Sequence, residues 1–450
     1  MRISPPWEVV AAIVHQADPE TLKALSLVSH DFHVETASTL CRVISICALS
    51  LESNGVDNFP LKRVRDATAT LQTHSRLQHI RRVRFRLCAS LGGPGDSSVE
   101  EGLGGLFTAF QGIKNIEVLE LDILFHQLAI ARCLNEIPLP RGLRQIEIWS
   151  LGPIIVSLRA EFWDRHREQL TSLTLLTAGP AEFEADTKKV SFPALEHLYI
   201  HEPELIQYFQ LPLAKTLRSL AINQIRLQDI EAFEATISVV HPEPLCPRFH
   251  PPCLSFRAPT YIYNASPIEE FSFGFTSLEH IPDPSIVYTT ILTHMPRLRK
   301  LVARHGIFHC TRAVMRASNA LVMNNKNLEE LHLVLPPWTI HDPLPSLLDA
   351  KAFLQQAVSE DDAFAVAGSE AATGDFEREA RLLMVVGEKS TTIAKFARLA
   401  MALKECRSLT RLSLFCGEMG GGTPDLNETS DLPPIVLVRN GLNMSWRVAA

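Results

Sequence analysis

Residues that could carry out covalent chemistry are scattered through this sequence and do not fall into the spacings of known catalytic sites. His250 with Cys253, and His309 with Cys310, are residue types that bind metal ions, but neither pair belongs to a set with zinc spacing. The glycine-rich stretches at 102–105 and 417–422 do not follow the spacing of a dinucleotide-binding or phosphate-binding loop, so we interpret both as turns. The sequence therefore predicts that the chain is not an enzyme and uses no metal ion or other cofactor.

Two groups of residues are better suited to recognising a partner than to catalysis. Glu147 and Trp149 alternate along one short segment, and His197, Tyr199 and His201 alternate along another. Residues two apart on a β-strand point to the same face, so the members of each group would share a surface. An indole ring stacks on cationic side chains, a carboxylate pairs with them, and imidazoles change charge near neutral pH. We predict that these residues bind a partner protein through an apolar or basic side chain, with arginine the best fit.

The segment between these two groups sets the expected shape of the surface. Ser172 and Thr174 are small, and we expect them to form a shallow floor between Trp149 and Tyr199. An alternative position for the binding surface is the basic run 82–86, which contains Arg82, Arg84 and Arg86.

A short repeated pattern predicts the elements that hold these side chains. An apolar residue is followed three and five positions later by two more apolar residues, as in Ile116, Leu119 and Leu121. The first positions of this pattern are Ile80, Ile116, Leu143, Leu170, Leu195, Leu217, Ile268, Leu298, Leu328 and Leu409. Most of the spacings between them are 22 to 30 residues, which is typical of stacked repeats. The spacing of 51 predicts one further repeat near 254–256, and the spacing of 81 predicts an insertion.

The repeats predict the fold class. Each repeat supplies one strand, and helices are expected between strands, for example at 162–169 and 312–323. A single unit of this kind cannot bury its own apolar face, so neighbouring units must stack. We therefore predict an α/β fold in which parallel strands and helices form a solenoid at 47–335. A helical insertion is expected at 336–408, with helices at 347–358 and 376–404. A final repeat and a C-terminal cap, with a last strand at 435–438, are expected at 409–450.

Composition limits the classes of partner. The chain has 450 residues, 46% hydrophobic and 21% charged, and a formal net charge of −7, so it is globular and carries no basic excess for nucleic acid or an anionic membrane. Its nine cysteines include no C-x-x-C pair, which favours reduced thiols in the cytosol or nucleus over a secreted disulfide framework. We therefore expect no nucleic-acid partner and no membrane partner.

The first 46 residues predict a small helical domain that precedes the repeats. Asp18 followed by Pro19 is a typical helix start, because an N-cap carboxylate precedes a residue that needs no backbone hydrogen bond. Two apolar stripes at helical spacing flank this start, one made of Val10, Ile13, Val14 and Ala17, the other of Leu22, Leu25, Val28 and Phe32. Helices this short are marginal alone, so we expect them to need each other and a partner.

This stretch resembles the F-box family. The family pattern of Leu-Pro-x-Glu, an apolar helix, an Asp-Pro turn and a Leu-rich helix with a Val-Ser ending corresponds here to the runs 5–8, 9–14, 18–19 and 22–32. Pro5 stands where the family usually has its opening Leu. The later repeats resemble the irregular leucine-rich repeats of fungal-type F-box proteins, although the consensus Asn after the strand is lacking, as at Ile225.

The resemblance implies a function and assigns roles to residues. It implies that the chain selects proteins for ubiquitination, by docking on a Skp-type adaptor and, through it, on a cullin. It assigns adaptor binding to Pro5, Pro6, Val9, Val10, Ile13, Val14, Leu22, Leu25, Val28 and Phe32. The substrate-binding residues are then Glu147, Trp149, His197, Tyr199 and His201. The alternative, which Pro5 favours, is a repeat scaffold that binds proteins without serving ubiquitination.

Overall fold

The structure is a computed structural model, and every structural statement below concerns the residues that it describes. These are 7–17, 19–29, 32–33, 35–36, 39, 42–48, 59–73, 77–87, 97–150, 154–177, 192–201, 216–225, 268–275, 284–304, 311–324, 327–335, 352, 354–355, 391–403, 406–416, 434–439 and 446–449. The chain divides into two compact units, Met1–Thr216 and Leu217–Ala450. Among the described helices, none is both long enough and apolar enough to cross a lipid bilayer.

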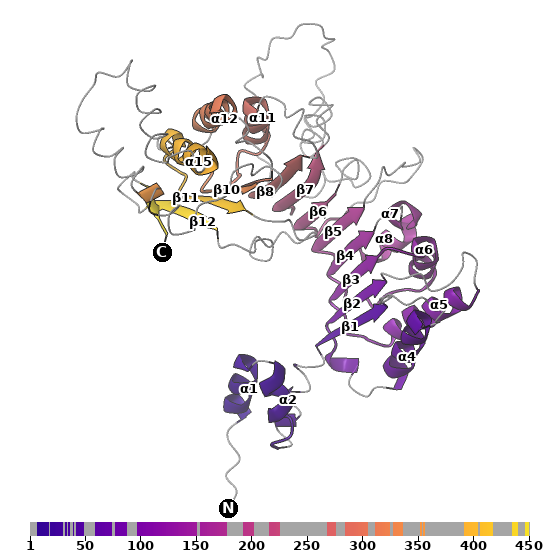
Figure 1. Cartoon of the computed structure of the whole chain (residues 1–450). Helices are drawn as coiled ribbons and strands as arrows, with labels where there is room; N and C mark the ends of the chain where they lie inside the picture. The colour runs from indigo at the N-terminus through magenta and orange to yellow at the C-terminus, as the bar shows by residue number, and fades with distance from the viewer. Residues whose placement is uncertain are drawn as a thin grey trace, which may run out of the picture. The chain divides into compact units, whose positions relative to one another are not determined.

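Two short helices begin the first unit (Figure 1). They are α1, Trp7–Gln16, and α2, Pro19–Leu25. Val10 and Val14 are four residues apart, so they lie on one face of α1, and both are buried. Leu22 of α2 is buried as well. Each helix therefore places part of its apolar stripe in a small core.

Six parallel strands follow in chain order, and each of them pairs with the next. They are β1, Val43–Ala48; β2, Arg82–Leu87; β3, Val118–Ile123; β4, Gln145–Ser150; β5, Ser172–Thr177; and β6, His197–Ile200. Helices cover one face of this ladder (Figure 1). They are α4, Phe59–Thr73; α5, Ser97–Gln111; α6, Gln127–Glu136; α7, Ile154–Ser157; and α8, Ala160–His166, with a short 3-10 helix, η1, at Leu77–His79.

Backbone hydrogen bonds fix the register where the strands begin. The carbonyl of the residue before each strand accepts two N–H groups from the next repeat. Glu117 O, for example, accepts from Arg144 N at 2.8 Å and from Gln145 N at 3.0 Å. The carbonyls of Arg42, Arg81, Arg144 and Thr171 accept the same pair of bonds, and the last pair comes from the N–H groups of Glu196 and His197. Equivalent residues of successive repeats therefore lie in straight rows across the ladder.

The second unit contains a similar ladder with a different ending. Its parallel strands are β7, Ser219–Ile225; β8, Glu270–Phe275; β9, Lys300–Arg304; β10, Glu330–Leu335; and β11, Arg411–Cys416. Two antiparallel strands complete it, β12, Ile435–Arg439, and β13, Trp446–Val448. Its helices are α11, Pro284–His294; α12, Thr311–Asn324; and α15, Thr391–Ala402.

The predicted strand positions are confirmed. The ten recurrences of the repeat pattern form strands β2–β11, and the three apolar residues of every recurrence are no more than 2% exposed. β10 and β11 pair directly although 81 residues separate Leu328 from Leu409, and most of the helical insertion expected at 336–408 lies outside the described residues. The α/β class with mostly parallel strands is therefore established for the described chain.

The expected last strand at 435–438 is present as β12, which pairs antiparallel with β11. The further repeat is expected near 254–256, and these residues lie outside the described chain; among the described strands, β7 pairs directly with β8. One expectation about the strands differs from the structure. β1 begins at Val43, inside the range expected to form the helical domain, and it pairs with β2.

The glycine-rich stretch at 102–105 is not the turn that the sequence predicts, because it lies inside α5. The helix buries Leu103, Phe107 and Phe110, and the rings of Phe107 and Phe110 meet edge to face at 5.4 Å between centroids. A Cβ at Gly102 would lie 2.9 Å from Leu61 Cδ1 of α4. The absence of a side chain at Gly102 therefore lets α5 pack close against Leu61 of α4, and the glycine does not form a turn.

Candidate binding surfaces

The face of β2–β6 that points away from the helices carries three rows of side chains. Side chains alternate along each strand, so the residues between the buried positions belong to this face. The strand pairings place Arg82, Val118, Gln145, Ser172 and His197 in the first row; Arg84, Glu120, Glu147, Thr174 and Tyr199 in the second; and Arg86, Asp122, Trp149 and Leu176 in the third. His201 follows β6, and its N–H donates to Leu175 O at 2.9 Å.

The arginines of β2 are paired with carboxylates of β3. Glu120 is buried and binds Arg82 at 3.2 Å, and it also accepts a hydrogen bond from Nε of Arg84. Arg86 lies 3.4 Å from Asp122. The basic run 82–86 is therefore largely neutralised within the ladder, which makes it a poor alternative site for an acidic partner.

Glu147 differs from the carboxylates of β3, because no cation of the described chain lies within ion-pair distance of it. Gln145 Nε2 donates a hydrogen bond to Glu147 Oε1. Burial raises the pKa of Glu147, and the negative charge of Glu120 raises it further. The hydrogen bond from Gln145 and the more distant Arg82 and Arg84 lower it, but by less. A cation from a partner would stabilise the ionised form of this carboxylate.

The predicted substrate-binding residues do not form one pocket around Ser172 and Thr174. Trp149 is opposite Leu176 across the strand pair, whereas Thr174 lies between Glu147 and Tyr199. The reason is the register, since Trp149 and Tyr199 occupy different positions of their repeats and so fall in different rows. Glu147 and Trp149, by contrast, are neighbours on one face of β4.

Exposure separates these residues further. Tyr199 is only 4% exposed, whereas His197 is exposed and His201 half-buried. Glu147 and Trp149 are half-buried, and this leaves each of them accessible while holding its orientation. Within the predicted group, the pair on β4 therefore has the better geometry for binding.

The N-terminal helices present a different kind of surface. Leu27 and Val28, which follow α2, are 87% and 66% exposed, and Ile13 of α1 is exposed as well. Among the predicted adaptor-binding residues, Val10, Val14 and Leu22 are buried, while Leu25 and Phe32 are half-buried. Pro5, Pro6 and the side chain of Val9 lie outside the described part.

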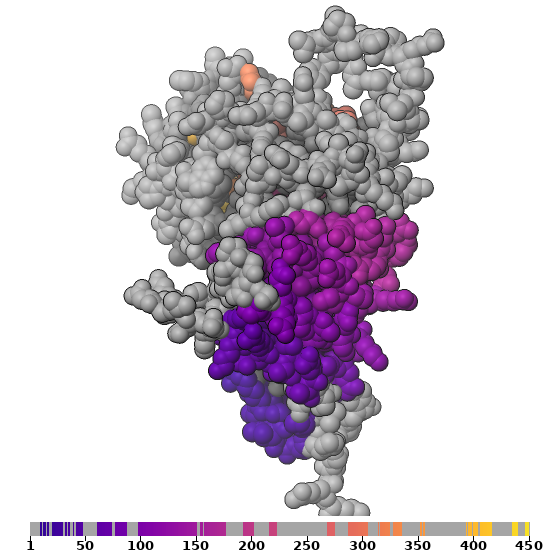
Figure 2. Space-filling view, turned by 90° about the vertical axis from the view of Figure 1, so that its right-hand side faces the viewer, coloured from indigo at the N-terminus to yellow at the C-terminus, as the bar shows by residue number. Residues whose placement is uncertain are grey.

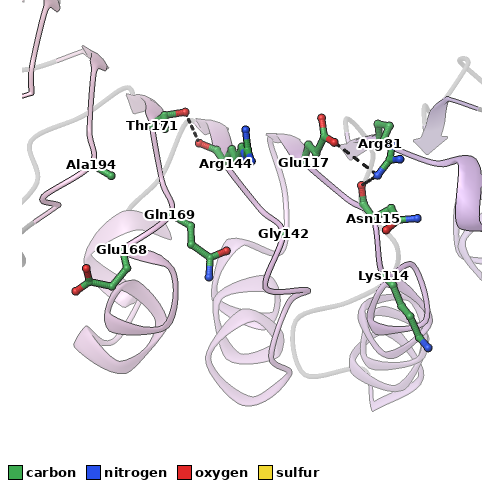
Figure 3. Close-up of a pocket in the computed structure, with 10 residues that line it drawn as sticks. All are labelled: Arg81, Lys114, Asn115, Glu117, Gly142, Arg144, Glu168, Gln169, Thr171 and Ala194. Atoms are coloured by element: carbon green, nitrogen blue, oxygen red, sulfur yellow. Dashed lines mark hydrogen bonds and ion pairs between the residues drawn. The ribbon is translucent and has the colours of Figure 1, made fainter.

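A recess opens at the edge of the first ladder, where the strands begin (Figure 3). Its volume is about 460 Å³. One side is formed by residues that directly precede the strands, Arg81, Glu117, Arg144 and Thr171. The other side is formed by residues two positions earlier in successive repeats, Asn115, Gly142, Gln169 and Ala194. Lys114 and Glu168 complete the lining.

This recess is not among the sites predicted from the sequence, although the aligned repeats contain a feature that indicates it. The four residues two positions before a pre-strand residue are uncharged, and two of them, Gly142 and Ala194, are the smallest residue types. Small side chains in one row leave a groove only if the register aligns them. Alignment of the repeats on their strands would therefore have predicted a groove along this row.

The residues considered for metal or phosphate binding lie outside the described chain. These are His250, Cys253, His309, Cys310 and the stretch 417–422. Among the described residues, no three His, Cys, Asp or Glu side chains are grouped so that they could hold a metal ion.

No protein-family model matches the chain, and no curated protein matches it.

Proposed function

We propose that this chain is the substrate-recognition subunit of a ubiquitin ligase of the Skp, cullin and F-box type. In this proposal the N-terminal helices dock on the Skp-type adaptor, and the strand face of the repeats selects the protein to be ubiquitinated. The chain performs no covalent step itself. It raises the effective concentration of a substrate lysine near the enzyme that carries ubiquitin.

The exposed apolar side chains of the N-terminal helices carry the proposal. Leu27 and Val28 belong to the run of the F-box resemblance, and both are more than half exposed. Docking on an apolar partner surface would remove these side chains from water. The buried stripe of Val10, Val14 and Leu22 supplies the internal core that positions them.

The repeat architecture supports the second half of the proposal. One parallel strand per repeat, three buried apolar positions per recurrence and helices on one face agree with leucine-rich repeats. Within the face, Glu147 and Trp149 are arranged for a cationic side chain, which can stack on the indole and pair with the carboxylate. A lysine-rich or arginine-rich segment of the substrate fits this pair.

Substitution of the exposed N-terminal residues tests adaptor binding. Leu27→Asp with Val28→Asp should abolish co-purification of the recombinant Skp-type adaptor, because charges would enter an apolar interface. Folding should be unaffected, since both side chains are exposed. Met323→Asp is the matched control, because Met323 lies on α12, is 84% exposed and belongs to the other unit.

The outcome decides between the two readings of the N-terminal helices. If the unmodified chain never binds a Skp-type adaptor, the proposal fails and a scaffold that binds proteins without ubiquitination is favoured. Point variants are preferable to removal of residues 1–46, because that deletion would cut through β1, which begins at Val43.

A further inference from the structure

We propose that the recess at the strand-start edge of the first ladder binds a short extended peptide through an acidic side chain, with Arg144 holding the carboxylate. This third binding surface is independent of the proposed adaptor and substrate surfaces. It uses the edge of the strands rather than their face.

Two cations that line the recess, Arg144 and Lys114, make no ion pair with any described residue. Glu117 is paired with Arg81 at 3.6 Å, and Glu168 is paired with Arg167 at 3.2 Å. Arg144 is exposed and makes no ion pair with any described residue. Both carboxylates of the lining are therefore compensated, whereas Lys114 and the Arg144 guanidinium at the centre are not, and an incoming carboxylate would form an ion pair with Arg144.

The shape of the recess fits an extended chain. It passes four consecutive strand starts, from Arg81 to Thr171, and three steps of about 4.8 Å give a length of about 14 Å. A peptide of about four to five residues at about 3.3 Å per residue spans that length. Figure 3 shows Gly142, which has no side chain, in the middle of the recess, with Arg144 and Gln169 on one side and Asn115 and Glu117 on the other.

Amide side chains along the recess suit the backbone of such a peptide. The Asn115 amide nitrogen already donates to Gln78 O at 2.7 Å, which holds that side chain in place. Gln169 is exposed on the wall beside Gly142, and its amide offers both a donor and an acceptor to a passing peptide group. The carbonyls of Arg81, Glu117, Arg144 and Thr171 are used in the ladder, so recognition falls to the side chains.

Gly142 brings its backbone close to that of the preceding repeat. A Cβ at this position would lie 3.3 Å from Ile116 O and 3.8 Å from Lys114 O, so a side chain here would require a small shift of the neighbouring backbone. The lining of the recess therefore has glycine at a point of close backbone contact.

Fluorescence anisotropy with labelled, blocked pentapeptides tests the proposal on the full chain. The probe Gly-Ser-Glu-Ser-Gly should bind at least about fivefold more tightly than Gly-Ser-Gln-Ser-Gly, since a charge-assisted hydrogen bond to the guanidinium is roughly twice as strong as a neutral one. The difference should shrink at high salt because the site is exposed.

Variants identify the group responsible. Arg144→Gln should remove the preference for the Glu peptide. Arg141→Gln is the matched control, because Arg141 is exposed in the same repeat but does not line the recess. Gln169→Glu, at a second exposed position, should weaken binding of the Glu peptide without touching Arg144.

Three results would overturn the proposal. They are equal binding of the Glu and Gln peptides, an equal effect of Arg144→Gln and Arg141→Gln, and competition by acetate or inorganic phosphate as effective as that by the unlabelled Glu peptide. The last result would identify a small-anion site instead of a peptide site. None of these measurements depends on the Skp-type adaptor, so failure here is distinguishable from failure of the proposed function.

Discussion

Two buried histidines show how the surroundings of a single residue decide what it contributes. His332 Nε2 lies 2.9 Å from Glu330 Oε2. Burial lowers the pKa of His332, and this carboxylate offsets part of that lowering. His166 packs edge to face on Phe162 at 5.4 Å, and its Nε2 has no hydrogen-bond partner. Burial, with a smaller contribution from Arg165, lowers the pKa of His166 to about 4. This ring is therefore neutral in the folded chain at every pH above that value.

His166 should make the first unit sensitive to acid. The unfolded chain binds the proton at a pKa of about 6.5, so stability is fully present above that pH and falls as the pH approaches 4. Between pH 7 and pH 5 we expect the unfolding free energy to fall by about 1–2 kcal/mol more in the original chain than in His166→Leu. Urea denaturation at both pH values measures this difference. Equal losses in the two proteins would contradict the assigned pKa.

At the scale of elements, one arginine joins the last strands of the second unit to a helix. Arg439 of β12 donates to Leu403 O at 2.7 Å and to Cys406 O at 2.8 Å, at the end of α15. Its guanidinium lies 4.0 Å from the centroid of the Trp446 ring of β13. The Trp446 indole nitrogen donates to Ala400 O at 2.7 Å. Side chains of two strands thus donate to carbonyls at the end of α15 and just after it, where Leu403 O and Cys406 O also accept the N–H groups of Cys406 and Leu409.

Removal of this arginine should destabilise the second unit. Arg439→Met keeps the apolar stem but removes two charge-assisted hydrogen bonds to backbone carbonyls and the contact with the Trp446 ring, so we expect a loss of about 2–4 kcal/mol. Arg447→Met is the control, because Arg447 is exposed on the neighbouring strand and should change stability by less than about 0.5 kcal/mol. Guanidinium denaturation of both variants tests this. Similar small effects would show that the arginine does not cap the helix.

The sequence predicts elements better than their pairing. The strands of the ladder follow from three apolar positions per repeat, because burial of one face is a local property of the pattern. The sequence of β1 has the same spacing at Cys41, Ile44 and Ile46. The pattern is not recognised there because it begins with a cysteine and lies next to the helical motif. The direction of β12 and the helical state of 102–105 depend on partners distant in sequence, and periodicity carries no information about those.

The same limit applies to the candidate binding surfaces. Alternation along a strand correctly places Glu147 and Trp149 on one face. The row in which each residue lies depends on the register between strands, and this separates Trp149 from Tyr199. Burial of Tyr199 and pairing of the arginines at 82–86 with Glu120 and Asp122 depend on neighbouring strands as well.

At the scale of the whole molecule, the two proposed binding functions should be separable. Trp149→Ala with Glu147→Gln removes the ring and the charge from the strand face, and we expect it to abolish capture of substrates while adaptor binding is retained. Tyr199 is left unchanged because substitution of this buried ring would also disturb packing. Quantitative proteomics of co-purified proteins measures both. An unaltered set of partners would place the substrate site elsewhere on the chain.

The change from parallel to antiparallel pairing at β12 has a consequence for self-association. A parallel ladder that stopped at β11 would offer a six-residue edge of unpaired backbone groups, on which a second copy could add its own first strand and build a filament. β12 covers that edge, and β13, with three residues, leaves little length for further pairing. The antiparallel hairpin thus acts as a terminator of polymerisation at this end of the sheet.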